Sequence, residues 1–214
     1  MDNQIKPFVV EFMGIPSENK SLIIESLRDM FRENGLYVCM IDNIMMSSYY
    51  KEVLDPKLKN LPISTKYQII NEEVRKELQT KTLENKGIIL IDGSLNERQL
   101  WNYYQYDLGN ICDPHYFSMR DIYSNFSRKL IDLLVIFCNR NDSTLENGLE
   151  IDNRLYNQYL FKLRPLYESS VNKYLMMDIN SMSKEEISYY IFNEIINKLD
   201  DKSVLKLRRS YGLK

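Results

Sequence analysis

The sequence contains no alanine, and it is poor in glycine, with 7 among 214 residues. Each glycine is therefore expected to mark a place where the backbone needs its conformational freedom. Cysteine is also rare, and Cys39, Cys112 and Cys138 form an odd number without metal-like spacing. Cys39 and Cys138 lie in apolar, strand-like runs. The pattern argues against a disulfide framework and is typical of reduced, buried thiols in a cytoplasmic protein.

Long apolar runs and an excess of charge of one sign are missing as well. No run approaches the roughly 20 residues of a bilayer-spanning helix, and the N-terminus MDNQIKPF lacks the features of a signal peptide. The 28 lysines and arginines nearly balance the 30 aspartates and glutamates. Nucleic-acid binding requires a clear excess of cations, so neither a membrane nor a nucleic-acid partner is expected.

Strand-like apolar runs alternate with helical periodicities. Strands are expected at residues 8–13, 36–41, 88–91, 133–137 and 174–177, and helices at 21–34, 65–78, from after 92 to 108, 113–129 and 151–170. A capping box of Ser183 and Glu186 begins the last helix. Strands separated by helices predict a parallel sheet with helices on both faces. We expect one α/β domain over residues 1–199 and a basic tail at 200–214.

The segment FVVEFMGIPSENKS, residues 8–21, is the most informative. A buried strand runs through a turn into a helix that begins with Lys20 and Ser21, the context of a phosphate-binding loop. Lys20 would reach the β- and γ-phosphates of ATP from a side chain that points to solvent without ligand, and Ser21 would ligate Mg²⁺. Asn19 replaces the usual second glycine, and asparagine tolerates left-handed backbone angles. The alternative is an ordinary strand–turn–helix with a surface lysine. The predicted triphosphate-binding residues are Gly14, Ile15, Pro16, Ser17, Glu18, Asn19, Lys20 and Ser21.

With VVEFMGIP at residues 9–16 and the following Lys20-Ser21, the sequence resembles P-loop kinases of the thymidylate kinase and deoxynucleoside kinase class. Residues 88–92 and 133–137 resemble the third and fourth strands of these kinases, and Asp178 followed by residues 183–199 resembles their final strand and helix. The resemblance implies a three-layer P-loop NTPase fold with strand order 2-3-1-4-5. It also implies a lid at about residues 139–153, and Mg²⁺-dependent phosphoryl transfer from ATP to a nucleoside or nucleotide.

The chain departs from the family pattern at several glycines and arginines. Ser17 and Asn19 replace loop glycines, Gly93 replaces the arginine of an Asp-Arg pair, and the lid segment 143–147 ends in Asn. A lost arginine can cost roughly 10³–10⁵ in the rate of phosphoryl transfer. A second hypothesis is therefore a nucleotide-binding regulatory or scaffold subunit with weakened or lost kinase activity. The cations that could substitute are Arg98, Arg140, Arg154 and Arg164.

Lys20, Asp92, Arg140 and Arg154 form the predicted catalytic set. Asp92 ends a strand at the sheet edge where ligands bind in α/β proteins, and with Ser21 it is the predicted metal ligand. Its alternative role is to cap the helix that begins near Asn96. The two arginines would close over the phosphates, or else pair with neighbouring acids on a solvated surface.

Asp42, Gln68 and Trp101 are the candidate acceptor-binding residues. Asp42 ends the second strand and otherwise forms a turn, whereas Gln68 lies with Arg75 on a helix that otherwise presents a solvated face. Trp101 belongs to an aromatic cluster that either stacks a base or packs the core. The other members of this cluster are Tyr103, Tyr104 and Tyr106.

Two charged features complete the expectations. Glu11 lies inside the first strand, where it either faces the acceptor cleft or forms a partly exposed pair with a lysine. The basic tail is either a solvated terminus or a docking strip for an acidic partner, and a homodimer is an open alternative. The basic residues of the tail are Lys202, Lys206, Arg208, Arg209 and Lys214.

Overall fold

The computed structural model describes residues 6–14, 18–41, 57–58, 60–93, 95–138, 153–171, 173–179 and 181–199. The described strands are β1 (Phe8–Gly14), β2 (Val38–Ile41), β3 (Ile88–Asp92), β4 (Leu133–Cys138) and β5 (Tyr174–Asp178). The described helices are α1 (Glu18–Glu33), α3 (Ile63–Glu84), α4 (Leu95–Asp107), α5 (Asp113–Leu130), α6 (Asn153–Ser170) and α7 (Lys184–Ile196).

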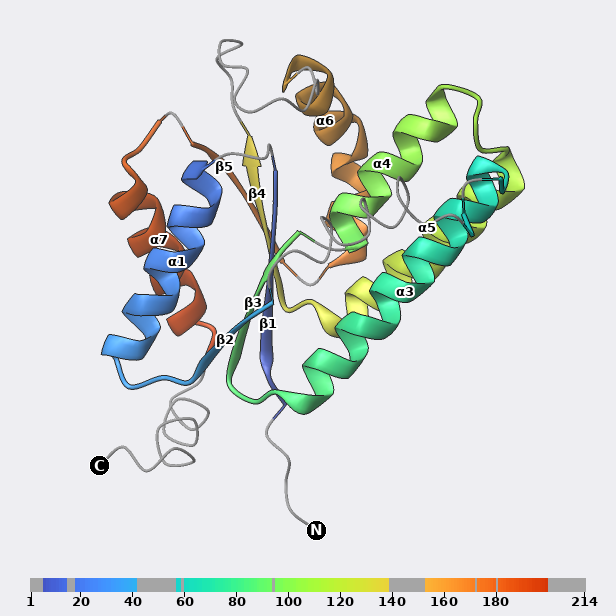
Figure 1. The fold of residues 1–214 in the computed structure, drawn as a ribbon. Coiled ribbons are helices and arrows are strands. Elements are labelled where there is room, and N and C mark those ends of the chain that lie inside the picture. The colour runs from blue at the N-terminus through green and yellow to red at the C-terminus, as the bar shows by residue number, and fades with distance from the viewer. Residues whose placement is uncertain are drawn as a thin grey trace.

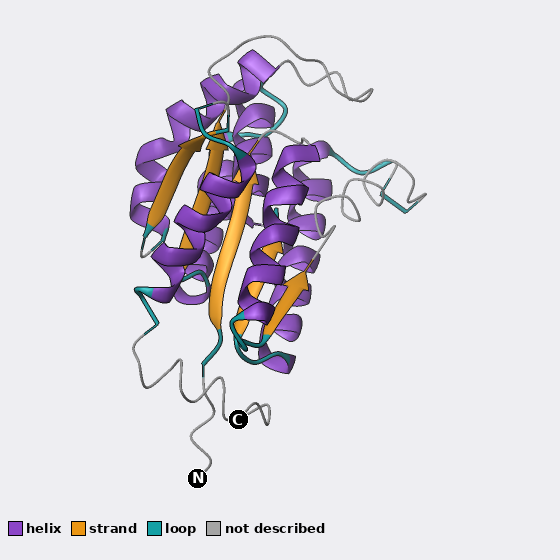
Figure 2. Ribbon diagram, turned by 90° about the vertical axis from the view of Figure 1, so that its left-hand side faces the viewer, coloured by secondary structure: helices purple, strands orange, loops and turns teal. Residues whose placement is uncertain are grey.

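The strands form one parallel sheet in the order β2-β3-β1-β4-β5, which confirms the expected α/β fold and its strand order. Figure 2 shows the arrows pointing toward the same end of the molecule. All carboxyl ends therefore meet at one edge of the sheet, with β1 at its centre between β3 and β4. This is the edge where open α/β sheets bind their ligands.

Helices cover both faces of the sheet. Helices α1 and α7 pack on one face, and α3, α4, α5 and α6 lie on the other (Figure 1). Strand β1 serves both layers, because Val9 and Met13 belong to the core under α3–α6 while Val10 and Phe12 belong to the core under α1 and α7. This alternation follows from the period of two along a strand.

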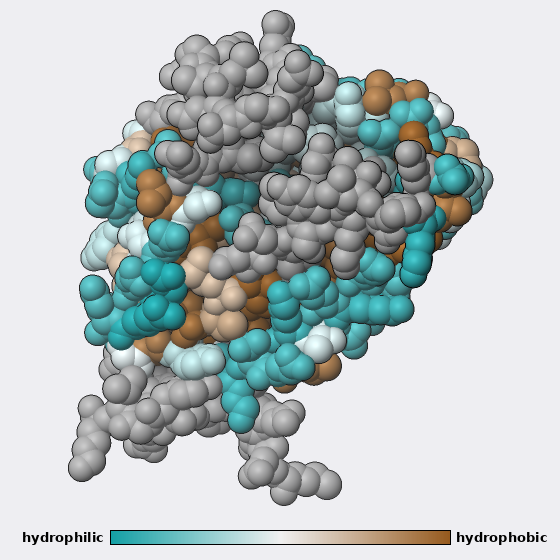
Figure 3. Space-filling view, viewed as in Figure 1, coloured by the Kyte–Doolittle hydropathy of each residue, from teal (hydrophilic) through white to brown (hydrophobic). Residues whose placement is uncertain are grey.

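The outer surfaces of the helices are mostly polar. In the view of Figure 3, hydrophilic residues cover much of the described surface and apolar residues show between them. Among the described residues, no helix is long and apolar enough to cross a bilayer. Cys138 is buried as expected, whereas Cys39 is only partly buried and Cys112 is exposed.

Several element boundaries differ from the expectation for local reasons. Helix α1 begins at Glu18, three residues early. Strand β2 begins at Val38 rather than at residue 36, because Leu36 N–H still donates to Phe31 O at 2.9 Å and closes the preceding helix. The capping box before α7 is confirmed: Ser183 Oγ accepts from the Glu186 backbone N–H at 3.2 Å.

Candidate functional site

The predicted strand and helix lie on either side of the expected phosphate loop. Strand β1 ends at Gly14 and α1 begins at Glu18. Ile15, Pro16 and Ser17, together with the side chain of Glu18, lie outside the described residues. Gly14 has φ +144°, and a Cβ atom there would stand 2.3 Å from the carbonyl oxygen of Phe137 on β4. Only glycine fits where the chain leaves the sheet for the loop.

Lys20 does not point to solvent, so that expectation is wrong. The residue is only 7 % exposed. Its Nζ lies 2.8 Å from Asp92 Oδ1 and 3.9 Å from Glu97 Oε2. Carboxylates at the end of β3 and in the first turn of α4 therefore give the ammonium partners inside the protein. The first turn of α1 thus faces the end of β3.

The two neighbours of Lys20 in sequence differ in exposure. Ser21 is exposed and Asn19 is half-buried in the first turn of α1. Helical residues have right-handed backbone angles, so Asn19 has no need of the left-handed conformation that its residue type was expected to supply.

Asp92 is the last residue of β3, as predicted, and its side chain is 23 % exposed. The chain then turns sharply, because Gly93 has φ +67° and its N–H donates to Phe12 O at 2.8 Å. A left-handed backbone is costly for any residue with a side chain. This geometry accounts for glycine where the resembling kinases carry arginine.

Glu11 is fully buried, so the expected partly exposed pair with a lysine is wrong. Its carboxylate accepts from the Asn96 backbone N–H at 3.1 Å and from Asn96 Nδ2 at 2.6 Å. A negative charge beside the first turn of a helix is favoured by the helix dipole. Glu11 therefore fixes the start of α4 against the central strand.

Glu97 is a site residue that the sequence did not reveal. It is 5 % exposed, and its Oε1 accepts from the Tyr156 hydroxyl at 3.3 Å. Burial raises the pKa of Glu97 to about 7; Lys20 opposes this shift, and Asp92 and Glu11 add to it. No periodicity or motif marks Glu97 in the segment SLNERQLW.

The same carboxylates act on Lys20 in the opposite sense. Burial alone lowers the pKa of the ammonium, but Glu97, Asp92 and Glu11 outweigh burial and raise it. Lys20 therefore remains charged throughout the neutral range. The single Lys20 ammonium thus interacts with three carboxylates, those of Glu97, Asp92 and Glu11, in a site with little water.

Tyr156 connects α6 with this cluster. Its side chain is 1 % exposed, and besides donating to Glu97 its hydroxyl interacts with the Gly14 backbone N–H. Burial, together with the nearby Glu97 carboxylate, raises the Tyr156 pKa well above its ordinary value. The phenol therefore stays protonated and remains a hydrogen-bond donor.

Of the four arginines that could replace the missing arginines of the resembling kinases, two have side chains that the structure describes. Arg98 is buried between α4 and α3, where its Nε donates to Asn71 Oδ1 at 3.0 Å and its guanidinium lies 4.7 Å from the Tyr67 ring centroid. Arg164 forms an exposed pair with Glu168 at 3.0 Å. Arg140 and the side chain of Arg154 lie outside the described residues, although the backbone of Arg154 is in the first turn of α6.

The acceptor candidates are only partly placed. Asp42 lies outside the described residues, and Gln68 is half-buried on α3. Arg75 forms a surface pair with Glu72 at 2.6 Å, in keeping with a solvated helix face. Trp101 packs edge-on against Tyr104 and Tyr156, with ring centroids 6.1 and 6.2 Å apart. The aromatic cluster therefore packs α4 against α6.

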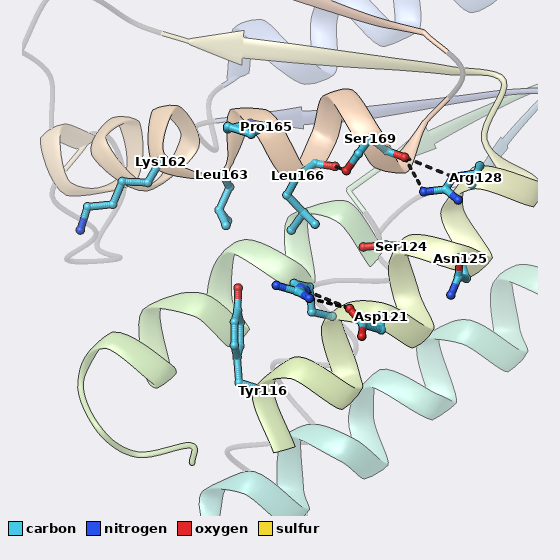
Figure 4. A pocket seen from close by; sticks show the side chains of 11 residues that line it. Tyr116, Asp121, Ser124, Asn125, Arg128, Lys162, Leu163, Pro165, Leu166 and Ser169 are labelled. Carbon is cyan, nitrogen blue, oxygen red and sulfur yellow. Dashed lines mark hydrogen bonds and ion pairs between the residues drawn. The ribbon is translucent and has the colours of Figure 1, made fainter. Parts of the chain in front are cut away.

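A separate groove of about 550 Å³ lies between α5 and α6 (Figure 4). Its cations already have protein partners. Arg120 pairs with Asp121 at 2.8 Å, Arg128 donates to Ser169 O at 2.7 Å, and Lys162 lies 5.0 Å from the Tyr159 ring centroid. The groove therefore does not compete with the Lys20 region as the candidate site.

Comparisons with known proteins address the fold. No family model matches the chain, and no curated protein matches it in sequence. A solved deoxyadenosine kinase from M. mycoides, with dCMP and a flexible dCDP bound, is similar with a TM-score of 0.55 and 15 % identity, over 89 % of this chain and 100 % of that chain. The chain has the P-loop kinase fold. A thymidylate kinase from Candida albicans is similar with a TM-score of 0.58 and 12 % identity, over 90 % of this chain and 92 % of that chain.

Within the P-loop kinase fold, the first strand leads into the phosphate loop. This chain has Lys20 in the first turn of the helix that follows this strand, beside the carboxylate that ends β3. The fold and the Lys20–Asp92 pair therefore locate the candidate site at the carboxyl edge of β1 and β3.

Proposed function

We propose that the protein transfers the γ-phosphoryl group of ATP to a nucleoside or nucleotide. The observation that carries the proposal is the 2.8 Å pair between Lys20 and Asp92. It joins the first turn of the helix after β1 to the carboxyl end of β3. Phosphoryl transfer depends mainly on positioning and on positive charge around the migrating group. Lys20 is the described cation that is placed to supply that charge.

The residues around Lys20 suit a triphosphate and a magnesium ion. The N-terminus of α1 attracts anions through its free N–H groups, and the residues that would enclose the phosphates are 14–21. Ser21 is exposed in the first turn of α1, and Asp92 keeps 23 % of its side chain exposed. A hydroxyl and a carboxylate are oxygen ligands of the kind that Mg²⁺ prefers.

Magnesium would depend on the nucleotide for further ligands. Among the described residues, no group of three or more acidic, histidine or cysteine side chains is arranged to hold a metal ion. Mg²⁺ commonly binds through one or two protein groups together with substrate phosphates. When bound, the ion neutralises charge that develops on the phosphate oxygens.

The acceptor class rests on the fold neighbours, a deoxyadenosine kinase and a thymidylate kinase. We propose that the acceptor approaches from the side of α3 and α4, where Gln68 and Trp101 are both half-buried. Asp42, which follows β2 in the sequence, would complete this side. Arg140, at the start of the expected lid, and Arg154, directly after it, would close over the phosphates.

The alternative function is a nucleotide-binding subunit with little or no kinase activity. Gly93 favours it, because its left-handed turn leaves no arginine at this position beside Asp92. Both functions include triphosphate binding, so they differ only in turnover.

Turnover distinguishes the two functions. Purified protein would be incubated with ATP and Mg²⁺ and with each member of a panel of nucleosides and nucleoside monophosphates. A kinase yields a phosphorylated acceptor and ADP with at least one of them. A protein that binds ATP but phosphorylates no member of the panel would support the subunit instead. The Lys76→Ala variant, which removes an exposed lysine of α3, is a suitable active control.

A further inference from the structure

Glu97 occupies a fixed position next to the phosphate-loop lysine. Its backbone is held because Glu11 on β1 binds both the backbone N–H and the side chain of the preceding residue, Asn96. Its Oε1 accepts from the Tyr156 hydroxyl at 3.3 Å, while its Oε2 lies 3.9 Å from Lys20 Nζ. The carboxylate is thus anchored on one oxygen and faces the lysine with the other.

The ammonium of Lys20 cannot fully serve the carboxylates and a triphosphate at once. Charges attract one another strongly where water is scarce, and Lys20 and Glu97 are 7 % and 5 % exposed. A triphosphate that binds Lys20 must therefore displace its ammonium from Asp92 and Glu97. The apparent affinity of a ligand falls with the fraction of protein that is ready to bind it.

Asp92 and Glu97 compete with a triphosphate for the Lys20 ammonium in different ways. Asp92 is closer to Lys20 and partly exposed, and in the proposed function it faces the metal. Glu97 is almost wholly buried and receives its hydrogen bond from a phenol on α6. That hydrogen bond stabilises the charged carboxylate, and so strengthens its attraction for Lys20.

We propose that Glu97 is a positioning residue that retains Lys20 at the end of β3 until a triphosphate displaces it. This inference rests on the proposed function, since it requires that Lys20 bind phosphate. Removing the charge of Glu97 then frees the lysine and tightens triphosphate binding. A purely structural role for Glu97 would instead make binding weaker or leave it unchanged.

The test compares ATP affinity in the presence of Mg²⁺ for the wild type, Glu97→Gln and Glu25→Gln at about pH 8, above the pKa of Glu97, so that the wild-type carboxylate is mostly charged. Glutamine keeps the shape of Glu97 and an oxygen to accept from Tyr156. Glu25 is an exposed residue of the same helix as Lys20, so its variant controls for the change in net charge. We expect Glu97→Gln to bind ATP about tenfold more tightly and Glu25→Gln to match the wild type. In a Lys20→Ala background, Glu97→Gln should lose its effect.

A second variant guards against misfolding of the first. Tyr156→Phe removes the donor that favours the charged carboxylate, so it should tighten ATP binding in the same direction but by less. Circular dichroism and thermal melting establish that each variant is folded. If Glu97→Gln misfolds, Tyr156→Phe decides alone, with weaker or unchanged binding counting against the proposal.

The possible failures are distinguishable. A wild type that binds ATP while folded Glu97→Gln binds it equally or less tightly overturns the role of Glu97 alone. An effect of Glu97→Gln that persists in the Lys20→Ala background does the same. Absence of ATP binding in both the wild type and Glu97→Gln overturns the proposed function, and the inference falls with it.

Discussion

Lys20 Nζ lies 2.8 Å from Asp92 Oδ1, so the lysine expected to bind phosphate is paired with the carboxylate at the end of the neighbouring strand. The pair joins α1 to β3 across the carboxyl edge of the sheet. In the proposed function, the lysine would exchange this anionic partner for another when a triphosphate binds.

Asn19→Gly should leave ATP affinity within about twofold of the wild type, because the residue lies in the first turn of a helix and needs no left-handed angle. Glycine in a helix costs about 0.5–1 kcal/mol relative to alanine, so a small loss of stability is expected. Calorimetric titration with ATP and urea denaturation measure the two effects. A large loss of affinity would show that the Asn19 side chain itself contacts the ligand.

Gly93→Arg should destabilise the protein rather than restore the arginine that the resembling kinases carry. The residue has φ +67°, and a side chain in the left-handed region costs roughly 1–2 kcal/mol. Gly109→Arg should be destabilised to a similar degree, because Gly109 has φ +76° and, with nothing within 4 Å of its added Cβ, the backbone strain acts there without a steric clash. Urea denaturation of both variants checks the prediction, and wild-type stability of Gly93→Arg would contradict it.

Glu97 should make stability depend on pH between about 4.5 and 7. Its pKa is raised from 4.5 to about 7, chiefly by burial, so the folded state binds more protons than the unfolded state in this range. The stabilisation from the bound proton is complete below pH 4.5 and is lost as the pH rises through 7. A shift of this size corresponds to at most about 3 kcal/mol in the free energy of unfolding.

Denaturation of the wild type and of Glu97→Gln at a series of pH values measures this contribution. Glutamine does not titrate, so the difference between the two free energies of unfolding should change steadily from about pH 4.5 to 7 and level off above pH 7. A difference that does not vary with pH would mean that Glu97 has an ordinary pKa in the folded protein.

Arg154→Ala should lower kcat by at least tenfold while changing ATP affinity much less. A lid guanidinium contributes mainly as charge develops in the transition state. Steady-state kinetics with the acceptor found in the panel, together with ATP titrations, separate the two effects. Arg164→Ala is the control, because Arg164 forms an exposed pair with Glu168. Wild-type turnover in Arg154→Ala would remove Arg154 from the catalytic set.

The sequence predicted the order and type of the described elements because strands such as residues 133–137 are apolar throughout and the helices carry regular stripes. It also predicted that Gly14, Lys20 and Asp92 belong to one region, since parallel strands share a carboxyl edge. The extent of the domain, the tail at 200–214 and the roles of Asp42, Arg140 and Arg154 stay predictions.

The interior of the site was beyond prediction from the sequence. Glu97 and Tyr156 are 59 residues apart, and neither belongs to a motif or a periodic pattern that pairs them. Lys20 is buried beside Asp92 and Glu97, which are far from it in the sequence. Glu11 is likewise buried against a distant residue, Asn96. Local patterns place a charged residue on an element, but they do not reveal which distant charge will meet it.

The most direct test of the central claim is calorimetric titration of ATP with Mg²⁺ into the wild type and Lys20→Ala, with Lys76→Ala as the control. If Lys20 binds the phosphates, Lys20→Ala should weaken ATP binding by at least about tenfold, which is 1.4 kcal/mol. Lys76→Ala should retain wild-type affinity. Equal ATP affinity in folded Lys20→Ala and the wild type would contradict the assignment of a phosphate-binding site to this loop.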